Sequence, residues 1–183
     1  MKKPFFLFAA LALTVASLAL AQTHAETDKS KRPSPPASAE HKFADGASLK
    51  IDYSSPRMKG RKIFGAVLVP YGQLGRTGAN EATSFVTSAN LTIGGKAVPA
   101  GSYTLFTIPG EKSWTLILSK KTGQWGTDYP GEKEDLLRVE MQVSATAAPV
   151  ENFTIALDGT GPKSATLRLE WESTRASVAI VQP

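Results

Sequence analysis

The segment Leu137-Arg-Val-Glu-Met-Gln-Val143 decides the fold class, because apolar and polar side chains alternate strictly along it. A second segment, Ala165-Thr-Leu-Arg-Leu-Glu-Trp171, repeats the pattern. Successive side chains of a β-strand point to opposite faces of the sheet, so this alternation predicts strands with one buried face.

Shorter runs of the same kind occur along the chain, separated by turn residues about every ten positions. They cover residues 48–53, 84–93, 102–108, 114–118, 153–157 and 176–180. The Gly94-Gly95 pair is typical of a tight hairpin turn, and the nearly continuous apolar run Ile63–Val69 predicts a short inner strand or one buried on both faces. With no convincing helix, the pattern predicts an all-β fold: a single antiparallel β-sandwich, jelly-roll-like, of about nine strands.

Composition excludes several kinds of chemistry. The 183 residues include no cysteine and only two histidines, so thiol nucleophiles, disulfides and cysteine-based metal sites are absent. We predict neither a metal nor a cofactor. The formal net charge of +5 falls to +3 when Lys2 and Lys3 are set aside, which is too small to predict nucleic-acid binding.

The N-terminus has the pattern of a cleaved secretory signal. Lys2 and Lys3 precede an apolar run from Phe5 to Leu20, and Ala19-Leu20-Ala21 places small residues at the expected cleavage site. We therefore predict a signal peptide over residues 1–21 and an exported protein, periplasmic or extracellular, with no transmembrane segment after cleavage.

The rest of the chain is predicted to have two parts. Residues 22–40 contain Pro33, Pro35 and Pro36 and are predicted to form an extended leader, because proline fixes φ and lacks an amide donor. Residues 41–183 are predicted to form the β-sandwich domain. The sequence does not indicate an oligomeric state.

The first candidate site is a basic stretch that follows residues 48–53. Its four cations are Arg57, Lys59, Arg61 and Lys62, and Asp52 and Tyr53 lie beside them in the chain. Guanidinium groups bind carboxylate or phosphate in bidentate fashion, which favours an anion site. The alternative is a solvated edge whose charges prevent pairing with other strands.

The second candidate site is the glycine-rich stretch 69–83, where glycine lets the backbone approach a ligand closely. Its directional hydrogen-bonding groups are Arg76, Asn80 and Glu81. They either bind a ligand or form a polar network that holds the loop to the sandwich. Trp125, in the irregular stretch 120–135, either packs at the core edge or offers a stacking surface to a ligand such as a sugar ring.

The leading hypothesis is a ligand-binding or envelope-associated module that uses these two stretches. Its partner would be an anionic small molecule, a glycan or an envelope protein. Whether the protein is an enzyme stays open; the alternative is a metal-independent hydrolase using Asp52, Glu81 and Arg76. In a third alternative, the network of residues 76–83 is purely structural.

Nine segments, spread over nearly the whole chain after the predicted signal, carry a family resemblance. They are Arg32-Pro-Ser-Pro-Pro36, Ile51-Asp-Tyr53, Lys59-Gly-Arg-Lys-Ile-Phe-Gly65, Val69-Pro-Tyr-Gly72, Arg76-Thr-Gly-Ala-Asn-Glu-Ala-Thr83, Pro99-Ala-Gly-Ser-Tyr103, Phe106-Thr-Ile-Pro109, Gln124-Trp-Gly126 and Leu169-Glu-Trp171. Together they resemble a family of exported bacterial proteins known as a domain of unknown function (DUF2911). The sequence departs from that family at Gly75, where tryptophan is common, and at Ser55, where arginine is frequent. The resemblance implies export and an all-β domain, and it implies no activity, substrate or cofactor.

Overall fold

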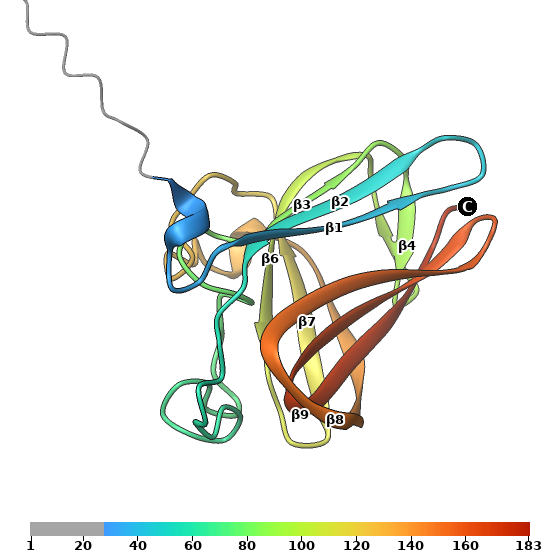
Figure 1. Cartoon of the computed structure of the whole chain (residues 1–183). Helices are drawn as coiled ribbons and strands as arrows, with labels where there is room; N and C mark the ends of the chain where they lie inside the picture. The colour runs from blue at the N-terminus through green and yellow to red at the C-terminus, as the bar shows by residue number, and fades with distance from the viewer. Residues whose placement is uncertain (1–27) are drawn as a thin grey trace, which may run out of the picture.

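The computed structural model describes residues 28–183 (Figure 1). The predicted signal peptide, residues 1–21, lies outside the described residues. In the described part of the chain, the helices are two single 3₁₀ turns, η1 (Lys29–Lys31) and η2 (Glu132–Glu134). Neither has the length or the apolar character needed to cross a membrane.

Nine strands make up the rest of the regular structure. They are β1 (Pro36–Lys42), β2 (Ser48–Ser54), β3 (Ser84–Thr87), β4 (Leu91–Ile93), β5 (Lys96–Val98), β6 (Gly101–Ile108), β7 (Ser113–Ser119), β8 (Asp135–Gly161) and β9 (Ser164–Val181). All belong to one antiparallel sheet in the order β1-β2-β3-β6-β7-β8-β9-β4-β5, which does not close into a barrel. The predicted all-β antiparallel fold of about nine strands is confirmed.

The sheet curls over its own apolar face, so that β1 and β2 lie across β8 and β9 (Figure 1). Alternation places Leu49, Ile51 and Tyr53 of β2 in the core between these layers. The rings of Tyr53 and Phe153 meet edge to face with centroids 5.8 Å apart. In the β1–β2 turn, the Ala44 amide donates to the Pro162 carbonyl of the β8–β9 turn at 2.9 Å, which holds the two layers together.

The long strands β8 and β9 each contain two of the alternating runs. Residues 135–142 pair with β7, whereas residues 154–161 pair with β9 alone. The register shifts after Ala145, where residues 146–149 of β8 face residue 173 of β9, and again after Val150, where residues 151–153 face residue 171. Extra residues on one strand bend the hairpin at these points. Short-range alternation marks each run but does not show that the chain continues as one strand across the bend.

One predicted strand is wrong. Ile63–Val69 is not a strand but part of a long loop between β2 and β3, here called the β2–β3 excursion (residues 55–83), which leaves the sheet (Figure 1). Its apolar residues do not share one environment, since Ile63 and Phe64 are buried and Val67 is fully exposed. The Ile63 and Phe64 amides donate to the Glu172 carboxylate, each at 3.3 Å, instead of to a neighbouring strand.

The sheet begins within the predicted leader. Residues 36–40 form the first part of β1, an edge strand that pairs only with β2. Proline is tolerated at the first position of an edge strand because its missing amide faces no partner. Residues 36–40 of the predicted leader therefore contribute to the sheet, and residues 29–31 form the 3₁₀ turn η1.

Candidate functional site

A cavity of about 740 Å³ lies between the β2–β3 excursion and the sheet. The excursion forms most of its wall, and the rest comes from β6, β7, β8 and β9, from Pro33 and Ser34, and from loop residues Pro109 and Thr127. The volume falls within the range of roughly 300–1,000 Å³ that is usual for small-molecule sites.

Aromatic side chains from four parts of the chain line the cavity beside aliphatic residues of the excursion such as Val67, Leu68 and Leu74. Phe64, Trp114, Phe153 and Trp171 all line the cavity, and each is nearly buried. The ring centroids of Phe64 and Trp114 are 5.0 Å apart, and those of Phe153 and Trp171 are 5.8 Å apart. The indole Nε1 of Trp171 donates to the Glu151 carbonyl, whereas that of Trp114 is buried without a partner among the described residues. These rings give the wall a rigid shape.

All of the charged side chains among the described residues that line the cavity are cations. They are Arg57, Lys59, Arg61 and Arg76, with no aspartate or glutamate among them. The Glu151 and Glu172 carboxylates lie beside the wall, where they accept hydrogen bonds from the Lys59 and Phe64 amides, but neither lines it. The four lining cations favour an anion.

Two of the arginines are held by the loop that carries them. The Arg61 guanidinium donates to the Met58 carbonyl at 2.9 Å and to the Arg57 carbonyl at 2.6 Å. Arg57 donates to the Ser55 hydroxyl at 3.0 Å, and that hydroxyl donates to the Phe153 carbonyl at 2.7 Å. Each guanidinium has five donors, so both keep N–H groups available for a ligand.

Arg76 is the cation with the most unused hydrogen-bonding capacity. It is half-buried in the cavity wall, and it makes no hydrogen bond or ion pair with any described residue. Its alkyl chain lies against the backbone of Gly126, where an added Cβ would come within 2.9 Å of Arg76 Cδ. Glycine at position 126 therefore leaves room for the side chain that is best placed to bind an anion.

Two residues of the cavity wall have a strained backbone. Lys59 and Thr77 have φ values of 49° and 52°. A β-branched residue rarely adopts this conformation, which costs on the order of 1–3 kcal/mol. Thr77 is held in it by a 2.9 Å contact between its hydroxyl and that of Thr107, and by the Thr83 hydroxyl, which donates to the Thr77 carbonyl at 2.7 Å. Strain of this kind gathers at binding sites more often than elsewhere.

Three of the residues predicted for the first site lie outside the cavity. Asp52 is exposed on β2, where its carboxylate is 3.2 Å from Lys50 Nζ. The Tyr53 hydroxyl accepts a hydrogen bond from the Ile155 amide at 3.1 Å, and burial raises the pKa of Tyr53. Lys62 is exposed and does not line the wall. Of the six residues named for this stretch, Arg57, Lys59 and Arg61 therefore share the cavity.

The second predicted site divides in the same way. Arg32 holds Glu81 with hydrogen bonds of 2.8 and 2.9 Å, and this lowers the pKa of Glu81. The Asn80 side chain donates to the Ser34 carbonyl at 3.0 Å. Trp125 forms a backbone bridge with Glu81, and its side chain is 48% exposed and outside the cavity wall. Asn80 and Glu81 thus attach the N-terminal segment to the excursion, whereas Arg76 faces the cavity.

Replacing Asn80 with alanine is expected to lower the free energy of unfolding by about 1–3 kcal/mol without changing the cavity, because the Ser34 carbonyl loses its donor. Asn80→Gly should cost less than Asn80→Ala, since φ is 57° at this position and glycine accepts that conformation freely. Urea denaturation of the three proteins measures both effects. Equal losses in the two variants would show that backbone conformation contributes nothing here.

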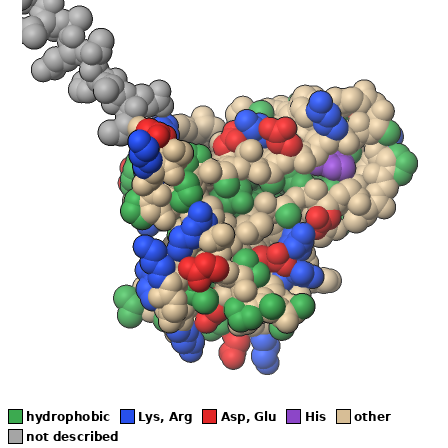
Figure 2. Space-filling view, viewed as in Figure 1, with side chains coloured by type: hydrophobic (Ala, Val, Ile, Leu, Met, Phe, Trp, Pro, Cys, Tyr) green, Lys and Arg blue, Asp and Glu red, His purple; other side chains and the backbone are tan. Residues whose placement is uncertain are grey.

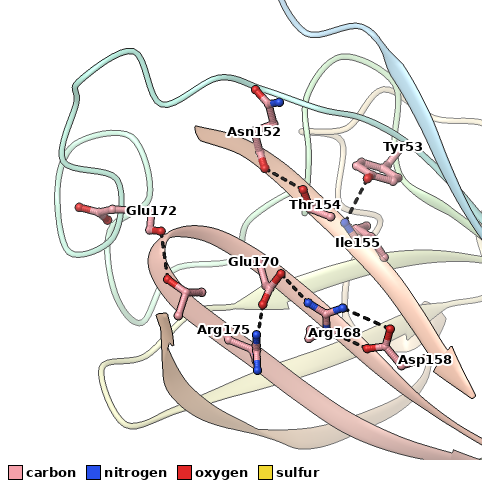
Figure 3. A network of polar contacts seen from close by, with 10 residues as sticks. Tyr53, Asn152, Thr154, Ile155, Asp158, Arg168, Glu170, Glu172 and Arg175 are labelled. Atoms are coloured by element: carbon pink, nitrogen blue, oxygen red, sulfur yellow. Dashed lines mark hydrogen bonds and ion pairs between the residues drawn. The ribbon is translucent and has the colours of Figure 1, made fainter. Parts of the chain in front are cut away.

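A charged network that the sequence did not reveal lies on β8 and β9 (Figure 3). Glu170 is buried and accepts hydrogen bonds from Arg168 and Arg175, both at 2.6 Å. Arg168 also donates to both carboxylate oxygens of Asp158, at 2.8 and 3.2 Å. The alternating pattern marked these residues only as the polar face of a strand, and none of them lines the cavity. We interpret the network as structural.

Comparison with protein families matches residues 34–180 to one described as "Protein of unknown function (DUF2911)". The chain belongs to this family. No match was found among curated proteins or among solved structures.

The DUF2911 match includes almost all of the candidate site. It contains the four cations and the four aromatic residues of the cavity wall, and of the cavity residues only Pro33 precedes it. The DUF2911 region therefore contains nearly the whole cavity. Arg32, which binds Glu81, lies just before the N-terminal end of that region.

Proposed function

We propose that this DUF2911 domain is a ligand-binding module that holds a small molecule with a carboxylate or phosphate group and an apolar or ring-shaped body. The observation that carries the proposal is the cavity, whose charged groups are four cations and whose apolar part includes four aromatic side chains. Cations of the excursion would bind the anionic group, and the rings would pack against the body of the ligand.

Arg76 is the residue on which the proposal depends most. A half-buried guanidinium with no partner among the described residues retains its full capacity for bidentate hydrogen bonding to a carboxylate or phosphate.

Thermal unfolding in the presence of matched probes tests the proposal. Benzoate and phenyl phosphate should raise the melting temperature, whereas the neutral benzyl alcohol should not. A ligand present at a hundredfold excess over its Kd adds about 2.7 kcal/mol of stability. Arg76→Ala should remove the stabilisation, and Lys50→Ala, which removes an exposed cation outside the cavity wall, should retain it.

Two outcomes would contradict the proposed site. One is stabilisation that survives the double substitution Arg57→Ala and Arg76→Ala. The other is equal stabilisation by the neutral probe, because the proposal assigns recognition to the cations. Circular dichroism of each variant would show that a lost response is not due to unfolding.

The hydrolase alternative has less support from the geometry. Neither Asp52 nor Glu81 lines the cavity that contains Arg76, and each carboxylate already lies beside a cation, Lys50 and Arg32 respectively. We propose that binding takes place after export, in the periplasm or outside the cell. That part of the proposal rests on the basic, apolar and small-residue pattern of residues 1–21.

A further inference from the structure

The far end of the β2–β3 excursion presents apolar side chains to solvent. Val67 is 101% exposed, Leu68 45% and Tyr71 42%, and these three residues are here called the apolar tip. Only three other large hydrophobic residues of the described chain are exposed, and none belongs to the excursion. A cluster of apolar side chains within five residues is a feature of interaction surfaces, whereas isolated exposed ones are ordinary.

Hydrogen bonds hold the tip in its outward-facing form. The Gly65 amide donates to the Val69 carbonyl at 3.0 Å and closes the turn that carries Val67 and Leu68. The Gly72 amide donates to the Pro109 carbonyl at 2.8 Å and fixes the returning chain. The Tyr71 ring covers Gly65 so closely that a Cβ there would come within 2.6 Å of it. Val67 and Leu68 are therefore exposed because these contacts fix the conformation of the turn that carries them.

The tip is attached to a strongly basic segment. Residues 55–80 contain five cations and no aspartate or glutamate, and Lys59, Arg61 and Lys62 among them are exposed. Lys and Arg side chains gather at the end of the molecule that bears the excursion, with hydrophobic groups beside them (Figure 2). An apolar projection next to cations is complementary to an anionic lipid surface, which has negative headgroups above an apolar layer.

We propose that the apolar tip inserts into the surface of an anionic bilayer while Lys59, Arg61 and Lys62 contact its headgroups. A second copy of the chain fits less well, because two such segments would repel each other. Three side chains are also far fewer than the 20–30 residues a side of a standard protein interface, whereas a bilayer requires no shape complementarity. The tip adjoins the proposed ligand site, because Lys59, Arg61, Val67 and Leu68 also line the cavity. Lys62 and Tyr71 lie outside the cavity wall, and Arg76 belongs to the ligand site alone, so substitutions at these positions distinguish the two proposals.

Cosedimentation with lipid vesicles tests the inference. The protein beginning at Gln22 retains every described residue and omits the apolar run 5–20, which would itself insert into lipid. It should bind vesicles of equal parts phosphatidylglycerol and phosphatidylcholine, and bind pure phosphatidylcholine vesicles far less. The double substitution V67D/L68D should weaken binding by about tenfold or more, and Lys62→Ala by about fivefold.

Matched substitutions elsewhere provide the controls. Val86→Asp introduces the same change at an exposed residue of β3, and Lys42→Ala removes an exposed cation of β1. Both should bind as the unchanged protein does. Arg76→Ala should also retain vesicle binding, which separates this inference from the ligand site.

Three results would overturn the inference. Absence of binding to the phosphatidylglycerol vesicles is the first. Binding that V67D/L68D leaves intact is the second, because it would show adsorption by charge alone. The third is a vesicle-independent dimer in light scattering that V67D/L68D dissociates, because the occupant of the tip would then be another copy of the chain.

Discussion

Replacing Phe153 with alanine is expected to lower the free energy of unfolding by about 3–5 kcal/mol, the usual cost of deleting a buried aromatic ring. Phe153 is 4% exposed on β8 and packs against Tyr53 of β2 and Trp171 of β9, with ring centroids 5.8 Å away in both cases. It therefore joins the two layers of the curled sheet and forms part of the cavity wall.

Urea denaturation measures this loss, and Val86→Ala is the control, because Val86 is 41% exposed on the same sheet. The control should change stability by no more than about 0.5 kcal/mol. Phe153→Leu keeps most of the apolar volume and should lose less than Phe153→Ala. A loss below about 1 kcal/mol in Phe153→Ala would mean that the layers do not depend on this contact.

Replacing Glu170 with alanine is expected to cost about 3 kcal/mol, near the lower end of the range for breaking a buried ion pair. Glu170 is buried and accepts 2.6 Å hydrogen bonds from Arg168 and Arg175. The cost stays near the lower end because Arg168 keeps Asp158 as a partner and the Arg175 side chain is 41% exposed. Glu40→Ala, which removes an exposed carboxylate on β1, should have little effect.

The same network should make stability depend on pH in the acid range. Burial opposes ionisation of Glu170, but the hydrogen bonds from Arg168 and Arg175 outweigh it and lower its pKa below the ordinary 4.5. Hydrogen bonding from Arg168 likewise lowers the pKa of Asp158 below the ordinary 3.8. The unfolded chain then takes up protons at a higher pH than the folded chain, so stability is full above these ordinary values and falls as pH decreases through them.

Urea denaturation between neutral pH and about pH 3 would measure this dependence. The unchanged protein should lose more stability over that interval than Glu170→Gln, which cannot titrate at this position. If the free energy of unfolding fell equally with pH in the two proteins, the loss of stability in acid could not be assigned to Glu170.

The all-β fold class could be predicted because strand formation follows from the pattern of adjacent residues in the sequence. Alternation along residues 137–143 and 165–171 reports which face of a strand is buried, and Gly94-Gly95 has the positive φ values, 53° and 81°, that its hairpin turn requires. The prediction of a strand at Ile63–Val69 was wrong for a related reason. Apolar character alone predicts burial, and the turn closed at Gly65 and Val69 instead exposes Val67.

The cavity could be predicted only in part. The sequence singled out Arg57, Arg61 and Arg76 as cations able to bind an anion, and the structure places all three in one wall. It could not show that Glu81 is paired with Arg32, 49 residues earlier in the chain. It also gave no sign of the aromatic wall, whose Trp114 and Trp171 lie on different strands.

The sequence by itself determined that this is an antiparallel all-β protein of the DUF2911 family with an acid-free basic stretch after its second strand. Those properties depend on local periodicity and on contiguous motifs. Only the tertiary structure decided which side chains of the candidate stretches share a cavity and which attach the N-terminal segment. The physical reason is that the curl of the sheet and the path of the excursion depend on contacts between residues far apart in the chain, which local patterns do not encode.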